Sequence, residues 1–125
     1  MQKNDLVILA VDDDMINLKL LKSMLSKSGK VKEVIEAKNG SDAIGHLKSR
    51  DDIDLILLDI IMPIMGGIDM LKVVRADDNL RQLPIIVLTT DETKKAEALE
   101  CGANGFLMKP IRNEELLKKI ATVIV

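Results

Sequence analysis

The chain has 125 residues, of which 47% are hydrophobic and 30% are charged, and its formal net charge at pH 7 is −2. This length suits a single domain, 1–125, and the charge balance argues against general nucleic-acid binding, which needs a strong basic excess. Phe106 is the one aromatic residue, which argues against base stacking, and the lone Cys101 excludes an internal disulfide. No apolar run is long enough to span a membrane, so we expect a cytoplasmic protein.

Short apolar runs bounded by turn signals indicate buried strands, and the chain contains a series of them. The second run is the weakest, and we expect it at or near an edge of the sheet. The five predicted strands are Leu6–Val11, Val34–Ala37, Ile53–Leu58, Ile85–Leu88 and Gly105–Met108.

Helical patterns separate these runs. Ile16, Leu20 and Met24, with the neighbouring Leu21 and Leu25, predict a broad apolar stripe on the first helix. The fourth helix has few large apolar residues, and weakly buried elements tend to be mobile. The five predicted helices are Met15–Ser28 with Asp14 as N-cap, Ser41–Ser49 with Ser41 as N-cap, Ile68–Ala76, Glu92–Cys101 with Asp91 as N-cap, and a last helix from Asn113.

The alternation of strands and helices determines the fold class. Each strand is connected to the next through a helix, and such crossovers are right-handed when the strands are parallel. The sequence therefore predicts an α/β protein, built as a three-layer (βα)5 doubly wound sandwich.

Polar residues directly follow four of the predicted strands. Asp12 and Asp13 follow the first, Asp59 the third, Thr89 the fourth and Lys109 the fifth. The carboxyl ends of parallel strands meet at one edge of a sheet, so these side chains should converge. Clustered carboxylates repel one another unless a cation joins them, and oxygen ligands suit Mg²⁺. A phosphoryl group on Asp59 would find an ammonium and a hydroxyl beside it, and an aspartyl-phosphate is a known covalent form of catalysis.

These residues resemble the CheY-like receiver domain of two-component response regulators, and the resemblance covers essentially the whole chain. Each matching segment alone is weak evidence, but four in this order, each at a strand end with helices between, are highly specific. The segments are Val11-Asp12-Asp13-Asp14, Asp59-Ile60-Ile61-Met62-Pro63-Ile64-Met65-Gly66-Gly67, Thr89-Thr90 and Gly105-Phe106-Leu107-Met108-Lys109-Pro110. The resemblance implies a flavodoxin-like, five-stranded parallel sheet of order 2-1-3-4-5, with the site between strands one and three.

The resemblance also implies roles for the residues at the metal. Asp59 would be the phospho-acceptor. Asp13 would bind Mg²⁺ directly, Asp12 would assist partly through water, and the backbone carbonyl of Ile61 would add a ligand.

Further residues match the family pattern around the phosphoryl group. Thr89 and Lys109 would contact the phosphoryl oxygens, and Phe106 falls where the family has a switch aromatic. The Lys109-Pro110 peptide resembles the family's cis bond.

Two other positions, Ile61 and Asp91, vary in the family and are associated with phosphoryl lifetime. The chain departs from the family at Gly66, where an Asp is frequent, so we expect a locally looser loop.

Plainer interpretations stand beside these roles. Asp14 alone fits a helix N-cap better than a ligand. Thr89 taken alone would be an ordinary strand-end hydroxyl, and Phe106 would be the one aromatic of the core. His46 lies on a polar helix face, and we interpret it as a solvent-exposed residue.

The leading functional hypothesis is a phosphorylation-activated signalling switch rather than a metabolic enzyme. It would take a phosphoryl group from the phosphohistidine of a histidine kinase or phosphotransfer protein. Its surface at the fourth helix, fifth strand and fifth helix would then change toward a downstream partner or output domain.

Two alternatives stay open. An aspartate-based phosphohydrolase would normally carry a cap domain, and no insertion here is long enough for one. A phosphorylation-independent interaction domain would be favoured by loss of Asp59, Lys109 or an acid, and none is lost.

Overall fold

The computed structural model describes residues 5–62 and 64–124. Residues 1–4, Pro63 of the quoted motif and the final Val125 lie outside the described residues. The elements in chain order are β1 (Leu6–Val11), α1 (Met15–Lys27), β2 (Val31–Ala37), α2 (Gly40–Ser49), β3 (Leu55–Asp59), α3 (Gly67–Ala76), β4 (Ile85–Thr89), the 3-10 helix η1 (Glu92–Lys94), α4 (Lys95–Glu100), β5 (Gly105–Met108) and α5 (Asn113–Ile124).

The sheet has the order β2-β1-β3-β4-β5, and every neighbouring pair is parallel. This confirms the predicted fold class and strand order. β2 lies at an edge as expected, but it begins at Val31 rather than Val34 and pairs along the whole of β1. Its first residues include the exposed Lys32 and Glu33, because an edge strand tolerates polar side chains and so gives a weak apolar signal.

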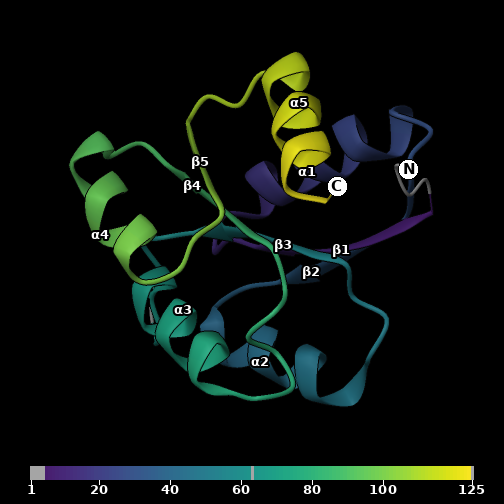
Figure 1. Cartoon of the computed structure of the whole chain (residues 1–125). Helices are drawn as coiled ribbons and strands as arrows, with labels where there is room; N and C mark the ends of the chain where they lie inside the picture. The colour runs from purple at the N-terminus through teal and green to yellow at the C-terminus, as the bar shows by residue number, and fades with distance from the viewer. Residues whose placement is uncertain (1–4, 63, 125) are drawn as a thin grey trace.

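The helices complete three layers. α1 and α5 cover one face of the sheet, and α2, α3 and α4 cover the other (Figure 1). Each face has its own apolar core: one includes Leu18 and Ile120 under α1 and α5, and the other includes Leu71 and Ala98 under α3 and α4. β1, β3 and β4 are buried along their whole length, which explains their unbroken apolar sequences.

The predicted apolar stripe of α1 is wrong in part. Ile16 is 69% exposed and Leu20 is 55% exposed, whereas the buried residues of the helix are Leu18, Leu21 and Leu25. Positions 18, 21 and 25 form one row at helical spacing, and a helix lying on a sheet buries only that row. Ile16 and Leu20 lie on a different face of the helix, close to the carboxyl edge of the sheet at which α1 begins.

Two helix starts also differ from the prediction. α2 begins one residue earlier, and its N-cap is Asn39, whose side chain accepts a hydrogen bond from the Asp42 N–H at 2.8 Å, rather than Ser41. Asn39 and Ser41 are both good N-cap residues, and the sequence alone did not distinguish them. The predicted fourth helix is divided into η1 and a shorter α4, in which only Ala98 is buried. Asp91 and Asp14 are N-caps, as predicted.

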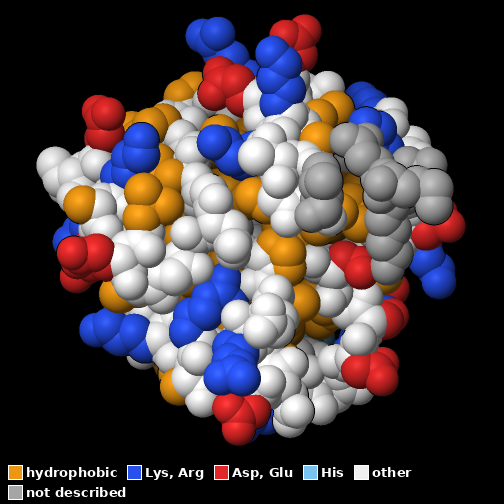
Figure 2. Space-filling model, viewed as in Figure 1, with side chains coloured by type: hydrophobic (Ala, Val, Ile, Leu, Met, Phe, Trp, Pro, Cys, Tyr) orange, Lys and Arg blue, Asp and Glu red, His pale blue; other side chains and the backbone are white. Residues whose placement is uncertain are grey.

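β3 and β4 each end one residue later than predicted. Asp59 pairs with Leu88 within the ladder of β3 and β4, and Thr89 pairs with Met108 within that of β4 and β5. Both residues therefore have their backbones fixed by the sheet, while their side chains lie at its carboxyl edge. On the face seen in Figure 2, Lys and Arg side chains lie beside Asp and Glu side chains, with apolar groups between them.

Candidate functional site

Three carboxylates meet at the carboxyl edge of the sheet. Asp12 and Asp13 follow β1, and Asp59 ends β3, the strand paired with β1. Carboxylate oxygens of the three residues all lie within 4.8 Å of one another. Asp12 and Asp59 are buried, at 1% and 6% exposure, whereas Asp13 is exposed. The structure thus brings the three predicted carboxylate ligands together, and one of them is open to solvent.

Asp12 is held through both of its oxygens. Its Oδ1 accepts a hydrogen bond from the Asp14 N–H at 2.9 Å, and its Oδ2 accepts one from the Lys109 Nζ at 2.9 Å. These contacts fix the side chain before any ligand arrives. Both oxygens of Asp12 therefore already have protein partners.

Lys109 lies between two of the acids. Its Nζ is 2.9 Å from Asp12 Oδ2 and 3.4 Å from Asp59 Oδ1, so its shorter contact is with Asp12. Burial opposes the charge of this lysine, but the hydrogen bond with Asp12 and the attraction of Asp59 outweigh it, and the pKa of Lys109 is raised. The Lys109-Pro110 peptide is cis, as the sequence predicts, and the Lys109 N–H donates to the Thr89 carbonyl at 2.8 Å.

The environment of Asp59 disfavours its charged form. Burial raises the pKa of Asp59 above its usual value, Asp12 and Asp13 raise it further, and Lys109 lowers it only in part. A divalent cation among these carboxylates would remove this conflict. Three carboxylates whose oxygens lie within 4.8 Å of one another are a donor set that suits a hard ion such as Mg²⁺.

Thr89 ends β4, and Phe106 lies on the neighbouring strand β5. Thr89 is 1% exposed, and its Oγ1 accepts a hydrogen bond from the Asp91 N–H at 3.2 Å. Phe106 is half-buried against the apolar core on the α3 and α4 side, and it pairs in register with Val87 of β4. The ring therefore has both core contacts and a path to solvent.

Ile61 and Asp91, the two residues that the resemblance led us to expect at positions affecting phosphoryl lifetime, differ in what they contact. The Ile61 side chain is 60% exposed. The Asp91 carboxylate accepts hydrogen bonds from the backbone N–H and the hydroxyl of Thr93, which lower the pKa of Asp91. Asp91 is thus engaged in capping η1.

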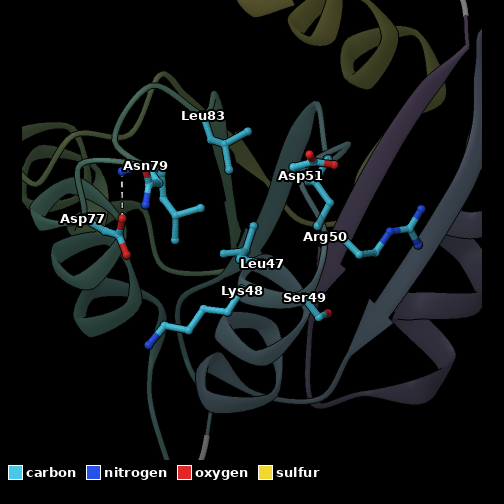
Figure 3. A pocket seen from close by; sticks show the side chains of 10 residues that line it. Leu47, Lys48, Ser49, Arg50, Asp51, Asp77, Asn79 and Leu83 are labelled. Atoms are coloured by element: carbon cyan, nitrogen blue, oxygen red, sulfur yellow. Dashed lines mark hydrogen bonds between the residues drawn. The ribbon is translucent and has the colours of Figure 1, made fainter.

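A hollow of about 860 Å³ lies at the opposite edge of the sheet, before β3 and β4. Leu47 and Leu83 face each other across it in Figure 3, and the Asn79 N–H donates to Asp77 at 2.8 Å at its rim. The Arg50 guanidinium, also at the rim, donates hydrogen bonds to the carboxylates of Glu33 and Asp52, which lie outside the hollow. This hollow is therefore remote from the carboxylates and does not belong to their site.

Comparison with known proteins agrees with this geometry. The sequence model of the response regulator receiver domain matches residues 8–121. The chain belongs to the response regulator receiver domain family. Such domains are phosphorylation-activated switches of two-component signalling rather than classical enzymes. None of the helices among the described residues has the length and apolar character needed to cross a membrane.

Three relatives illustrate the match. Chemotaxis protein CheY1 of Helicobacter pylori is 37% identical over 120 residues, which are 94% of this chain and 95% of that protein. The receiver domain of sensor histidine kinase PA1611 from Pseudomonas aeruginosa, solved with a magnesium ion in its active-site cleft, has 29% identity and a TM-score of 0.86, with 96% of this chain and 98% of that one covered. The CheY of a CheX–CheY–BeF3–Mg complex from Borrelia burgdorferi has 28% identity and a TM-score of 0.87, with 96% and 90% covered.

Proposed function

We propose that Asp59 accepts a phosphoryl group from the phosphohistidine of a histidine kinase or phosphotransfer protein, in a Mg²⁺-dependent reaction. The observation that carries this proposal is the position of Asp59 Oδ1, 3.4 Å from the Lys109 ammonium and within a cluster of three carboxylates. Asp59 is the last residue of the buried strand β3, so the position of its side chain does not depend on a mobile loop.

The transfer follows from these positions. An Asp59 oxygen attacks the phosphorus atom, the P–N bond of phosphohistidine breaks, and the imidazole nitrogen leaves with the electron pair and takes up a proton. Lys109 and the Thr89 hydroxyl would contact the phosphoryl oxygens. Asp13, Asp59 and the Ile61 carbonyl would hold Mg²⁺ with help from Asp12. The ion would supply the positive charge that both carboxylates and phosphoryl oxygens require.

The exposed start of α1 supports docking of the phosphoryl donor beside the site. Met15 is 51% exposed, Ile16 is 69% exposed and Leu20 is 55% exposed, next to the acids that follow β1. Apolar side chains gathered at a rim are typical of protein interfaces. The natural donor would therefore be a protein that docks on this surface, and acetyl phosphate can replace it in the assay below because it needs only the carboxylate and Mg²⁺.

We propose α4, β5 and α5 as the surface that carries the signal to a downstream protein or a fused output domain. Leu99 of α4 and Met108 of β5 are 43% and 38% exposed there. The CheX complex of the Borrelia relative supports a protein partner. We further propose that residues 1–125 act as one receiver domain in the cytoplasm, without direct contact to nucleic acid or membrane.

Intact-mass spectrometry tests the acceptor. With Mg²⁺ and acetyl phosphate, the wild-type protein and Asp78→Asn should each gain one phosphoryl group, because Asp78 is exposed and remote from the cluster. Asp59→Asn should gain none. Equal labelling of wild type and Asp59→Asn would disprove the assignment, and sustained release of phosphate from a small ester would favour the phosphohydrolase alternative.

A further inference from the structure

Gly40, the first residue of α2, is in close contact with Met65 in the loop between β3 and α3. The Gly40 N–H donates to the Met65 carbonyl at 3.1 Å. A Cβ atom on Gly40 would lie 2.7 Å from Met65 Cγ, 2.9 Å from Met65 Sδ and 2.9 Å from the Met65 carbonyl oxygen. Real Cβ atoms essentially never approach other atoms this closely, so a side chain at position 40 would displace Met65, including its backbone carbonyl.

The same loop begins at the phospho-acceptor proposed above. The two ends of this loop are joined by a hydrogen bond from the Gly67 N–H to the Ile60 carbonyl at 2.8 Å. A Cβ on Gly67 would lie 2.5 Å from the Asp59 carbonyl oxygen, so the start of α3 is packed directly on the end of β3. Met65 is thus separated by only a short length of backbone from Asp59.

The loop contains a residue that needs external support. Ile64 has a φ of 68° and is 86% exposed. A β-branched residue in the left-handed region is strained, and such strain persists only when surrounding contacts enforce it. The side chain of Ile64 is largely in solvent, so the enforcement must come from its neighbours, and Met65 is the next residue.

We propose that Gly40 and Met65 are positioning residues for the phosphorylation site. Their contact holds the loop backbone that leads from Asp59 past the Ile61 carbonyl, so that this carbonyl and the carboxylate are in place together. Neither residue touches substrate or metal. This inference rests on the proposed function, because the loop matters through the Mg²⁺ ligands that it carries.

Gly40→Ala tests the contact, and Gly45→Ala is its matched control. Gly45 lies in the same helix, but nothing is within 4 Å of a Cβ built on it. Gly45→Ala should fold, bind Mg²⁺ and become phosphorylated like wild type, with slightly higher thermal stability from its better helix propensity. Gly40→Ala should bind Mg²⁺ about tenfold more weakly, in the range seen when residues that orient metal ligands are replaced. Titration calorimetry without a phosphoryl donor measures this affinity.

The kinetic pattern separates positioning from mere structural damage. At low Mg²⁺, phosphorylation of Gly40→Ala by acetyl phosphate should be slower than that of Gly45→Ala, and saturating Mg²⁺ should restore most of the rate. The double variant Gly40→Ala/Met65→Ala lacks the Cγ and Sδ contacts and retains only the carbonyl contact. It should therefore recover part of the lost affinity.

Several outcomes would overturn the proposal. If Gly40→Ala and Gly45→Ala bind Mg²⁺ with the same affinity, the proposal is wrong. It is also wrong if Gly40→Ala has a lower melting temperature but an unchanged Mg²⁺ affinity. If Gly40→Ala does not fold, Met65→Gly, which leaves α2 unaltered, must weaken Mg²⁺ binding or the proposal fails. Absence of labelling in wild type would refute the proposed function instead, while the calorimetric comparison would still decide the positioning role.

Discussion

At the scale of single residues, the charge of Asp59 governs the behaviour of the metal-free protein. Burial and the neighbouring acids raise its pKa from the usual 3.8. The folded state therefore binds this proton more tightly than the unfolded chain does. The resulting stabilisation is fully present below the unfolded pKa and is lost as pH rises through the higher folded value. At neutral pH the buried carboxylate thus lowers the free energy of unfolding.

Asp59→Asn should raise the melting temperature of the metal-free protein at pH 7 by a few degrees, because the amide carries no buried charge. The difference from wild type should shrink as pH falls toward 4. Mg²⁺ should stabilise wild type more than the variant, since a ligand that binds only the folded state adds to its stability. Thermal melts at several pH values, with and without Mg²⁺, measure these differences. A lower melting temperature for Asp59→Asn at pH 7 would contradict the electrostatic argument.

Ile61 is the residue expected to set the lifetime of the phosphoryl group. Hydrolysis needs a water held in line with the bond to Asp59, and an apolar side chain two residues later offers it no hydrogen bond. Ile61→Asn should lose phosphate faster, by about tenfold, which corresponds to about 1.4 kcal/mol in the barrier. Phosphate release from purified phosphoprotein in excess Mg²⁺ is the assay.

The comparison with Asp91→Ala completes this test. Because Asp91 already accepts hydrogen bonds from Thr93, its carboxylate is less available to orient a water than the sequence alone indicates. Asp91→Ala should therefore change the hydrolysis rate less than Ile61→Asn does. If Ile61→Asn is no faster than wild type, the water-exclusion argument fails and Asp91 becomes the residue to investigate.

At the scale of elements, Arg75 holds the turn that follows the C-terminal end of α4. Arg75 of α3 donates from Nε to the Gly102 carbonyl at 3.0 Å, from Nη1 to the Arg81 carbonyl at 3.0 Å and from Nη2 to Asn104 Oδ1 at 2.9 Å. Asn104 Oδ1 also accepts a hydrogen bond from the Ile85 N–H at 2.9 Å. Arg75 thus joins α3 to the turn between α4 and β5 and to the start of β4.

Arg75→Ala should lower the free energy of unfolding by about 2 kcal/mol, because three acceptors lose a charged donor. The matched control is Arg81→Ala, whose side chain is 58% exposed and makes one long ion pair with Asp78. That variant should change stability by less than about 0.5 kcal/mol. Urea unfolding measures the change in the free energy of unfolding for both variants. Equal effects of the two substitutions would show that the Arg75 network contributes little.

The elements also show what sequence patterns can and cannot predict. The resemblance to the receiver-domain family implied the strand order. The convergence of Asp12, Asp59 and Lys109 was predictable from the strand pattern itself, because parallel strands share one carboxyl edge. The exposure of Ile16 was not predictable, since a helical apolar pattern shows which residues share a face of the helix but not which face packs on the sheet. The contact of Gly40 with Met65 was also missed, because it depends on tertiary packing and the only local signal is a glycine at a helix start.

At the scale of the whole molecule, the proposed switch requires that a phosphoryl group on Asp59 change a distant surface. Thr89 Oγ1 accepts the Asp91 N–H, so a Thr89 hydroxyl drawn toward a phosphoryl group would release the backbone that leads into η1. Phe106 is half-buried on the adjoining strand and has no hydroxyl, so moving its ring inward leaves no polar group unpaired. With the far end of α4 held through Gly102, the motion should be largest at the start of α4.

The phosphoryl mimic beryllofluoride tests this coupling by NMR. In wild type with Mg²⁺, chemical shifts should change at the rim and also over residues 91–97 and 105–108, with smaller changes at 102–104, where Arg75 holds the chain. In Thr89→Ala, the mimic should still bind at Asp59, and the changes around Phe106 should be lost because the hydroxyl that connects the site to β5 is absent. Changes confined to the rim loops in wild type would refute the switch. Unaltered distant changes in Thr89→Ala would show that the signal travels by another path, such as the direct contact of Lys109 with the end of β4.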